Sequence, residues 1–264
     1  SLDALARISP GQLIFGPDPT EPTASIGGMA ACNASGSRSL FYGPVRDHVA
    51  ALRVILADGS LAELRRGETA ARGLAFTLPL CGGGEFRGEL PDYTTPQTKD
   101  AGYYIQPDMD MLDLFIGSMG TLGIISELEL RLCPAYKLSW GLTAFLPDDL
   151  AAINYTRILR GEELPGMPAF AYRPTAIEFF DKQTLDMVVR QKAITPSFQQ
   201  LQELPPDYHS AIYAEFNDDD SDNIWPTLEK LAEIITAAGG NPENTWVADG
   251  PRNLEKLIFF RHTV

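Results

Sequence analysis

The segment IGGMAACNASG, residues 26–36, has a composition suited to binding a ligand through its backbone. Gly27 and Gly28 stand together, and small residues and one asparagine surround them. Glycines and small side chains let backbone amides approach a ligand closely, and amides near the start of a helix favour anionic groups such as phosphate. We therefore predict a cofactor that carries phosphate.

The spacing of these glycines fits neither of two common phosphate-binding patterns. It is not GxGxxG after a strand, and it is not GxxxxGK[ST], so both the dinucleotide fingerprint and the P-loop are excluded. A second interpretation needs no ligand, because a helix could instead pack tightly against a sheet through Gly27, Gly28 and Ala30. From this segment alone the two interpretations remain open.

The histidines give no sign of a metal site. His48, His209 and His262 lie far apart in the sequence, without the spacing of ligands to one metal, so we predict no metal centre. His48 follows Arg46 and Asp47, where we expect a turn, and His209 is expected in a loop.

Other chemistries find little support. The acidic run NDDDSD, residues 217–222, lacks the glycine and the final glutamate of a calcium loop, so we predict a helix-capping turn there. No GxSxG is present to suggest a serine nucleophile. Cys32, Cys81 and Cys133 are odd in number and widely spaced, which argues against a disulfide frame, a zinc site or an iron–sulfur cluster.

The first half of the chain is expected to contain strands joined by turns and loops. Residues 49–66 give two short strands around Asp58-Gly59, a hairpin signal in which both central positions need positive φ. Residues 67–108 are rich in Gly, Pro and Thr and predict a long surface excursion. Residues 109–118 have helical spacing, and after a GTLG turn residues 124–132 alternate as a half-buried strand.

From about residue 136 strands and helices alternate, which predicts an α+β domain with helices against one face of a mainly antiparallel sheet. The longest helix, residues 222–240, places Ile224, Leu228, Leu231 and Ile235 on one stripe and ends at Gly239-Gly240. The other expected elements are strands at 136–147, 175–181, 210–217 and 245–249, and helices at 148–161, 182–192 and 251–260.

Composition narrows the partners. With 264 residues, 44% hydrophobic and 21% charged, the chain is long enough for one large or two ordinary globular domains. The net charge of -14 argues against a nucleic acid partner or an anionic membrane surface. No apolar run approaches the roughly 20 residues that span a bilayer, and the given residues do not start with a basic and apolar leader, so we expect a cytoplasmic protein.

Three segments, in this order, resemble one known fold. They are TASIGGMAACNASGSRSLFYGPVRDHVAALRVILADG, KDAGY and DLFIGSMGTLGIISELELRLCP. Together they resemble the FAD-binding fold of the vanillyl-alcohol oxidase (p-cresol methylhydroxylase) type, and most of all its branch of D-lactate dehydrogenases and glycolate oxidase D-subunits. The resemblance implies that residues 1–135 form the second part of that FAD-binding domain. Residues 136–264 then resemble an incomplete substrate domain of the FAD-linked oxidase C-terminal type.

The resemblance implies FAD as the cofactor and suggests which residues contact it. In the family, the two segments that match residues 25–28 and 33–36 wrap the ribityl chain and pyrophosphate with main-chain amides, and the glycine turn after them touches the adenine side. Lys99 and Gly102-Tyr103 match an element near the cofactor, where packing is an equally open role. The implied cofactor-binding residues are Ser25, Ile26, Gly27, Gly28, Asn33, Ala34, Ser35, Gly36, Tyr42, Gly43, Gly120, Gly123 and Ile124.

Departures from the family pattern also carry expectations. Met119 stands where the family has an acidic residue in GSEGTLG, so that carboxylate is absent here. The chain begins without Met and ends at FFRHTV, so we expect a fragment of a longer protein. The family's first pyrophosphate loop and its histidine-bearing HxGDGN-type segment, which holds the catalytic base, would then lie outside residues 1–264.

Oxidation of a 2-hydroxyacid needs a cation for the carboxylate, a base for the hydroxyl proton and a flavin for the hydride. Arg261 matches the arginine of the family's W-x-(L/I)-R-(E/K) segment, and its planar fork suits a carboxylate. We expect Arg261 to anchor the substrate, with a surface ion pair as the alternative. Arg173 is a weaker candidate, and His262 adjoins Arg261.

Three functions stay open at this point. The first is an FAD-dependent dehydrogenase or oxidase that takes a hydride from a small D-2-hydroxyacid and passes electrons to an unidentified acceptor. The second is a flavoenzyme of the same fold with another substrate. The third is a non-catalytic scaffold subunit that lacks the flavin.

Overall fold

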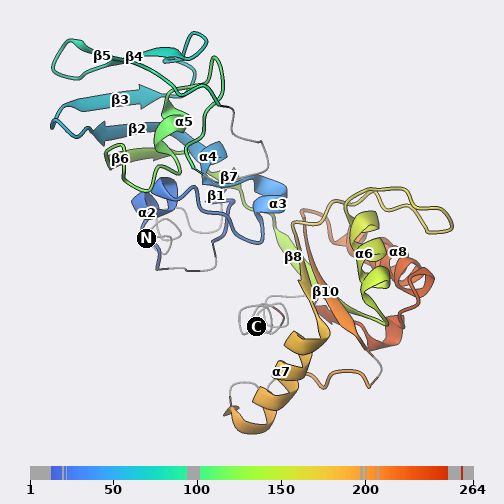
Figure 1. Ribbon diagram of the computed structural model, residues 1–264. Helices are drawn as coiled ribbons and strands as arrows, with labels where there is room; N and C mark the ends of the chain where they lie inside the picture. The colour runs from blue at the N-terminus through green and yellow to red at the C-terminus, as the bar shows by residue number, and fades with distance from the viewer. Residues whose placement is uncertain are drawn as a thin grey trace. The chain divides into compact units, whose positions relative to one another are not determined.

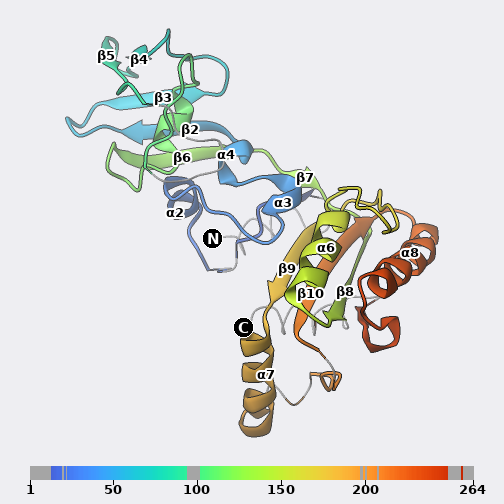
Figure 2. The ribbon, with the colours of Figure 1, turned by 45° about the vertical axis from the view of Figure 1, so that its right-hand side comes forward.

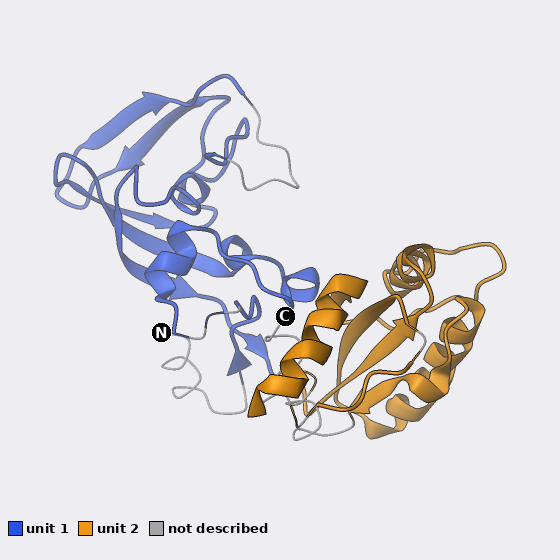
Figure 3. Cartoon of the chain, turned by 60° about the horizontal axis from the view of Figure 1, so that its bottom comes forward, with its two compact units in different colours: residues 1–135 blue, residues 136–264 orange. Residues whose placement is uncertain are grey.

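The computed structural model describes residues 13–19, 21, 23–93, 102–196, 199, 201–206, 208–248 and 257. The chain divides into two compact units, Ser1–Ala135 and Tyr136–Val264, which Figure 3 colours separately.

Unit 1 is built on a three-stranded antiparallel sheet (Figure 1). Its strand order is β3 (Leu61–Arg65), β2 (Val49–Ile55) and β6 (Ile124–Leu130). Ala62 and Leu64 of β3 are fully buried because alternate residues of a strand point to the same face. The sequence prediction of these three strands is confirmed. The two-stranded pair β1 (Leu13–Ile14) and β7 (Cys133–Pro134) lies apart from this sheet.

The predicted hairpin between β2 and β3 is present, but its turn differs from the expected one. Leu56 and Ser60 close a three-residue loop, in which Gly59 donates to the Leu56 carbonyl at 2.9 Å. Only Gly59 of the Asp58-Gly59 pair has a positive φ, 84°. A type I turn followed by one left-handed residue needs a positive φ at that residue alone, so the expectation for Asp58 is wrong.

The surface excursion predicted over residues 67–108 contains a second hairpin. β4 (Ala75–Pro79) pairs antiparallel with β5 (Glu85–Glu89), from Ala75 opposite Glu89 to Pro79 opposite Glu85. The expected surface excursion therefore contains regular structure, which the sequence prediction did not include. The glycine-rich sequence forms the turn itself, with Gly83 and Gly84 at φ of 89° and 91°.

The helices of unit 1 are short. They are α2 (Ile26–Ala31), α3 (Ser39–Tyr42), α4 (Val45–His48) and α5 (Leu112–Phe115). The helix predicted over residues 109–118 is thus present only as the four residues of α5. The carboxylate of Asp110 accepts the Leu112 amide at 3.1 Å and starts the turn, and Gly117, with φ of 85°, ends it.

Unit 2 has a four-stranded sheet that is antiparallel throughout. The strand order is β11 (Trp246–Ala248), β8 (Leu138–Leu146), β10 (Ser210–Asp218) and β9 (Ala176–Phe180). Nine residue pairs join β8 to β10, from Leu146 opposite Ser210 to Leu138 opposite Asp218. The predicted strands and the mainly antiparallel sheet are confirmed.

The helices predicted for unit 2 are confirmed within the described residues. They are α6 (Asp149–Leu159), α7 (Lys182–Ile194) and α8 (Ile224–Ala237). Asp148 and Asp181 cap α6 and α7, each accepting a backbone amide at 2.8 Å. On α8, Leu231 and Ile235 of the predicted stripe are buried. The helix predicted over 251–260 lies outside the described residues except for Leu257.

The helices do not all cover one face of this sheet, so that part of the prediction is wrong. α6 and α8 lie on one side of β8 and β10 (Figure 1), where Trp140 and Phe216 stack with ring centroids 4.5 Å apart. α7 follows β9 directly (Figure 2), and its Leu185 and Val188 pack with residues of the opposite face. Both faces carry apolar residues, so both need a cover.

Candidate functional site

The predicted ligand segment folds as a helix and a turn. Ser25 caps α2 by accepting the Gly28 amide at 3.0 Å on its hydroxyl. The amides of Ile26 and Gly27, in the first turn, have no acceptor within the described part of the chain. Asn33, just after the C-terminal end of α2, has a left-handed backbone with φ of 45°. α2 therefore offers two unused backbone donors on a surface without large side chains.

The glycines of α2 separate the two interpretations of this segment. Among the described residues outside the helix backbone, a β-carbon added at Gly27 would meet no atom within 4 Å, and one added at Gly28 would meet only the Ser25 hydroxyl, at 2.8 Å. Ala30, by contrast, is fully buried. The helix therefore packs through Ala30, whereas Gly28 is exposed and Gly27 is half-buried with open space at its β-carbon position. This arrangement favours the interpretation in which the two glycines leave room for a ligand.

Three other predicted glycines are explained by the protein's own packing. A β-carbon at Gly36 would lie 1.9 Å from the Asp18 carbonyl oxygen, one at Gly43 would lie 2.2 Å from an Asp47 carboxylate oxygen, and one at Gly123 would lie 2.6 Å from the Val54 side chain. These positions require glycine whether or not a cofactor binds. Their glycines therefore carry no information about a ligand.

Most amides of residues 33–36 are already used. The Asn33, Ala34 and Gly36 amides donate to Ala30, Met29 and the Ser39 hydroxyl. Ser35 donates no bond within the described chain and is exposed. Of the backbone amides in residues 33–36 that were predicted to contact the cofactor, the Ser35 amide is therefore the one still available.

The turn before β6 lies directly beside the C-terminal end of α2. Gly117 donates to the Ala30 carbonyl at 3.0 Å, and Met119 donates to the Ala31 carbonyl at 2.8 Å. A β-carbon at Gly120 would meet nothing within 4 Å. The structure thus brings together the two sequence segments predicted to contact the cofactor.

The side chains at this turn point outward. Met119 is 71% exposed with φ of 54°, and Ile124 is 67% exposed. Tyr103, from the predicted GY element, shares a hydrogen bond of 2.7 Å with the Thr121 hydroxyl. Thr121 in turn donates to the Ser118 carbonyl at 2.6 Å. Tyr103 therefore contributes to the order of the turn, while Lys99 lies outside the described residues.

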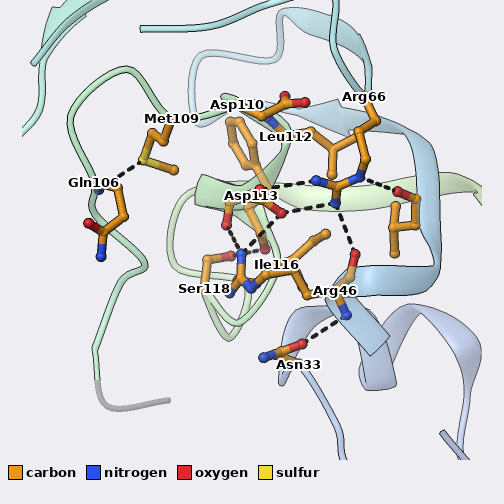
Figure 4. A network of polar contacts seen from close by, with 12 residues as sticks. Asn33, Arg46, Arg66, Gln106, Met109, Asp110, Leu112, Asp113, Ile116 and Ser118 are labelled. Atoms are coloured by element: carbon orange, nitrogen blue, oxygen red, sulfur yellow. Dashed lines mark hydrogen bonds and ion pairs between the residues drawn. The ribbon is translucent and has the colours of Figure 1, made fainter. Parts of the chain in front are cut away.

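A network of polar side chains lies behind both segments (Figure 4). The Asn33 side chain accepts the Arg46 amide at 2.9 Å, and the Arg46 guanidinium donates to the carbonyls of Asp113 and Ile116 at 2.6 and 2.7 Å. Arg66 donates to both oxygens of the Asp113 carboxylate, at 3.1 and 3.0 Å. Burial alone would lower the pKa of Arg66, but the hydrogen bonds and charge of Asp113 outweigh it and raise that pKa.

Sequence reasoning missed this network, although one signal was available. Asp113 is a carboxylate between Leu112 and Leu114 in an apolar run, and its side chain is 12% exposed. A carboxylate in such a place needs a cationic partner. The partners Arg46 and Arg66 lie 67 and 47 residues away, so no local pattern identifies them.

The histidines and arginines singled out in the sequence analysis lie at different places in the structure. The two His48 ring nitrogens lie 2.9 Å from the Tyr42 carbonyl and 3.2 Å from the Arg131 carbonyl. His209 is exposed, with Nε2 3.4 Å from Asp149. Arg173 is exposed. Arg261 and His262 lie outside the described residues.

The acidic run forms a capping turn, as predicted. Asp220 accepts the Asp222 amide at 3.0 Å and caps a short 3-10 helix, Ser221–Asn223. Burial would raise the pKa of Asp218, but hydrogen bonds from Tyr172 and neighbouring groups lower it.

Unit 2 also holds a polar group that sequence reasoning missed. The Tyr213 hydroxyl donates to Glu215 at 3.0 Å, and both residues are fully buried in β10. Thr143 lies opposite Tyr213 in β8 and is also fully buried. Burial of a carboxylate costs free energy unless the carboxylate is hydrogen-bonded, and here the Tyr213 hydroxyl supplies a hydrogen bond. The second face of the sheet therefore contains buried polar groups as well as apolar side chains.

Comparison with known proteins agrees with the motifs. Residues 1–65 match the protein family described as "FAD binding domain". The chain is 28% identical to a D-lactate dehydrogenase of Anaerostipes hadrus over 90% of its own length, and 29% identical to the glycolate oxidase subunit GlcD of Bacillus subtilis (strain 168) over 74%. The predicted resemblance is confirmed: residues 1–65 match part of an FAD-binding domain, and the chain is similar to proteins named D-lactate dehydrogenase and glycolate oxidase subunit. The match to the FAD-binding domain supports the prediction of FAD as the cofactor.

The fold comparison points to the same architecture. The solved structure of an alkyldihydroxyacetonephosphate synthase matches with a TM-score of 0.53 at 15% identity, covering 94% of this chain and 39% of that one. The predicted α+β class with an FAD-binding fold is thereby confirmed. This chain spans 41% of the D-lactate dehydrogenase and 34% of the glycolate oxidase subunit. No helix among the described residues is long and apolar enough to cross a membrane.

Proposed function

We propose that this chain is part of an FAD-dependent oxidoreductase that takes a hydride from a small D-2-hydroxyacid. The observation that carries the proposal is the outward-facing backbone of Gly27 and Gly28, within the FAD family match and beside the turn at Gly120. Such a surface fits a dinucleotide, because a phosphate can approach backbone amides that no side chain shields.

The two walls of this site would be residues 25–28 with Ser35 on one side and the Gly120 turn on the other. Ser25 would keep its role as helix cap, because its hydroxyl already accepts the Gly28 amide. Met119 would extend over the mouth of the site, since its side chain is 71% exposed. Tyr42, Gly43, Gly123 and Ile124 stay predictions as further contacts.

In the proposed reaction the bound flavin supplies the hydride acceptor. The backbone of residues 25–28, Ser35 and the Gly120 turn would hold the cofactor in place. Arg261 is proposed to hold the substrate carboxylate through its planar guanidinium. Unit 2 is proposed as the substrate domain. The electron acceptor and the cytoplasmic location also stay predictions.

The decisive experiment is Gly27→Ala in the full-length protein. The methyl group would stand where the phosphate approaches, so we expect FAD affinity, measured by titration of flavin fluorescence, to fall about tenfold or more. In the absence of FAD the variant should be about 0.5–1 kcal/mol more stable, because alanine is the better helix former.

The matched control is Gly82→Ala. Gly82 also has open space around its β-carbon, but it lies in the β4–β5 turn. This variant should bind FAD like the wild type. Equal FAD affinity for Gly27→Ala and the wild type would overturn the proposed site.

One observation favours a second function, a scaffold subunit without flavin. The position where the family has an acidic residue is Met119, so a polar contact to the cofactor is lost. A full-length protein that is purified colourless and shows no flavin absorbance after incubation with FAD would support this alternative. A flavin spectrum bleached by D-lactate or a similar D-2-hydroxyacid would exclude it.

A further inference from the structure

The two walls of the proposed site belong to segments about ninety residues apart in sequence, and little backbone contact joins them. Among the described residues, the amides of Gly117 and Met119 bond to the carbonyls of Ala30 and Ala31. The turn contains left-handed residues at Gly117, Met119 and Gly120 and no regular structure of its own. Beyond these two hydrogen bonds, further support for its spacing from α2 comes from side chains.

Arg46 contacts both segments at once. Its backbone amide is held by the Asn33 side chain, at the end of the α2 segment. Its guanidinium donates to the carbonyls of Asp113 and Ile116, immediately before the turn. The fit is close, since a β-carbon at Gly117 would lie 3.4 Å from the Asn33 side chain and 3.5 Å from the Arg46 guanidinium.

Other groups fix the orientation of Arg46. Asp113 lies 3.3 Å from its Nη1, and the Tyr104 ring lies under the guanidinium at 4.4 Å. Arg66 donates to the Asp113 carboxylate and also to the Arg46 carbonyl, at 2.9 Å. The guanidinium presents five donors in a fixed planar fork and here serves two carbonyls and a carboxylate, whereas the three donors of a lysine ammonium leave from one atom and do not reproduce that fork.

We propose that Arg46 is a positioning residue that sets the distance between the two walls of the cofactor site without touching the cofactor. The effect on the cofactor rests on the proposed function. The link between the two segments rests only on contacts within this chain. Loss of the fork would release the turn at residues 117–120 from α2 while the sheet of unit 1 remains folded.

The test is Arg46→Lys, which keeps the charge, in the full-length protein. Without FAD, hydrogen exchange at the amides of Gly117 and Met119 should become about tenfold faster or more, whereas exchange in β2 and β6 stays unchanged. FAD affinity should weaken about tenfold. The control is Arg53→Lys, which alters a half-buried arginine of β2 paired with Glu63 and Glu127, away from the turn, and should change neither quantity.

A second variant approaches the same link from its other end and covers the case in which Arg46→Lys does not fold. Asn33→Gly keeps the positive φ at no steric cost and removes the side chain that accepts the Arg46 amide. It should also speed exchange at residues 117 and 119. Unchanged exchange at these two amides in the folded variants, or a uniform increase across unit 1, would overturn the inference.

The two arms separate this inference from the proposed function. If the wild type binds no FAD but Arg46→Lys still frees the turn, the coupling holds and the cofactor assignment fails. If FAD binds normally to a variant with a freed turn, the positioning role fails and the cofactor assignment stands.

Discussion

The sheet of unit 2 and the loop region around α2, α4 and α5 of unit 1 are held together in different ways. In unit 2 long regular elements bury apolar faces, and Trp140 stacks on Phe216 at the centre. In unit 1 helices of four to six residues are fixed by side chains that bond to backbone carbonyls, chiefly Arg46 and Arg66. The irregular backbone beside the proposed site is therefore ordered by a few charged groups in addition to its buried apolar residues, such as Leu112 and Phe115.

The largest effect is expected in the core of unit 2. Trp140→Ala removes a side chain that is 1% exposed, so the free energy of unfolding should fall by about 3–5 kcal/mol. Urea denaturation of the full chain measures the loss, and hydrogen exchange should locate it in β8, β10 and α8. Trp225→Ala is the matched control, because Trp225 is 71% exposed and its loss should cost about 0.5 kcal/mol or less. Similar losses for both tryptophans would contradict this account of unit 2.

A smaller but still large effect is expected at the network of unit 1. Asp113→Asn leaves Arg46 and Arg66 without their carboxylate, and should cost about 2–4 kcal/mol. Glu127→Gln, which breaks an exposed pair with Arg53 in the same unit, should cost about 1 kcal/mol or less. Denaturation followed by exchange at residues 110–121 distinguishes the two. If both variants lose the same small free energy of unfolding, the network around Asp113 does not stabilise the loops of unit 1.

The smallest expected effect is a pH dependence at the start of α7. Hydrogen bonds from Thr184 lower the pKa of Asp181 below its usual value. The cap therefore contributes stability that is fully present above about pH 4, the pKa of an unfolded aspartate, and is lost as the pH falls through the lower folded pKa. Exchange protection of residues 182–186, measured at pH 6 and pH 3, should fall on acidification.

Asp181→Asn tests the sign of this effect. Asparagine also accepts the capping bond, so α7 should persist, but its protection should no longer depend on pH over this range. A variant that still loses protection on acidification would show that another group is responsible.

The same contrast explains how much could be predicted from the sequence. In unit 2, periodicity placed every described strand and helix, because each buries one face and so repeats apolar residues at a fixed interval. Periodicity did not predict that α7 covers the opposite face of the sheet. An apolar stripe identifies the buried face of a helix but not the side of the sheet on which that helix packs.

In unit 1 the sequence indicated the glycine-rich motifs but not the polar network that holds them in place. Composition and resemblance predicted that the glycine pair and the GTLG turn contact the cofactor, and the structure places these two segments side by side. The hairpin β4–β5 was missed because Gly82, Gly83 and Gly84 look like a loop when the strands beside them are short. The reasons for Gly36 and Gly123 could not be predicted, because the atoms that crowd them come from distant residues.

The pairing of β1 with β7 has a consequence for how the protein is made. Leu13 lies opposite Pro134, so the last backbone pair of unit 1 joins residues more than a hundred positions apart. Contacts of such long range form slowly because the intervening loop must be ordered first. On the ribosome, unit 1 can complete this pair only after Pro134 has left the exit tunnel, and by then the first strand of unit 2 is already being synthesised.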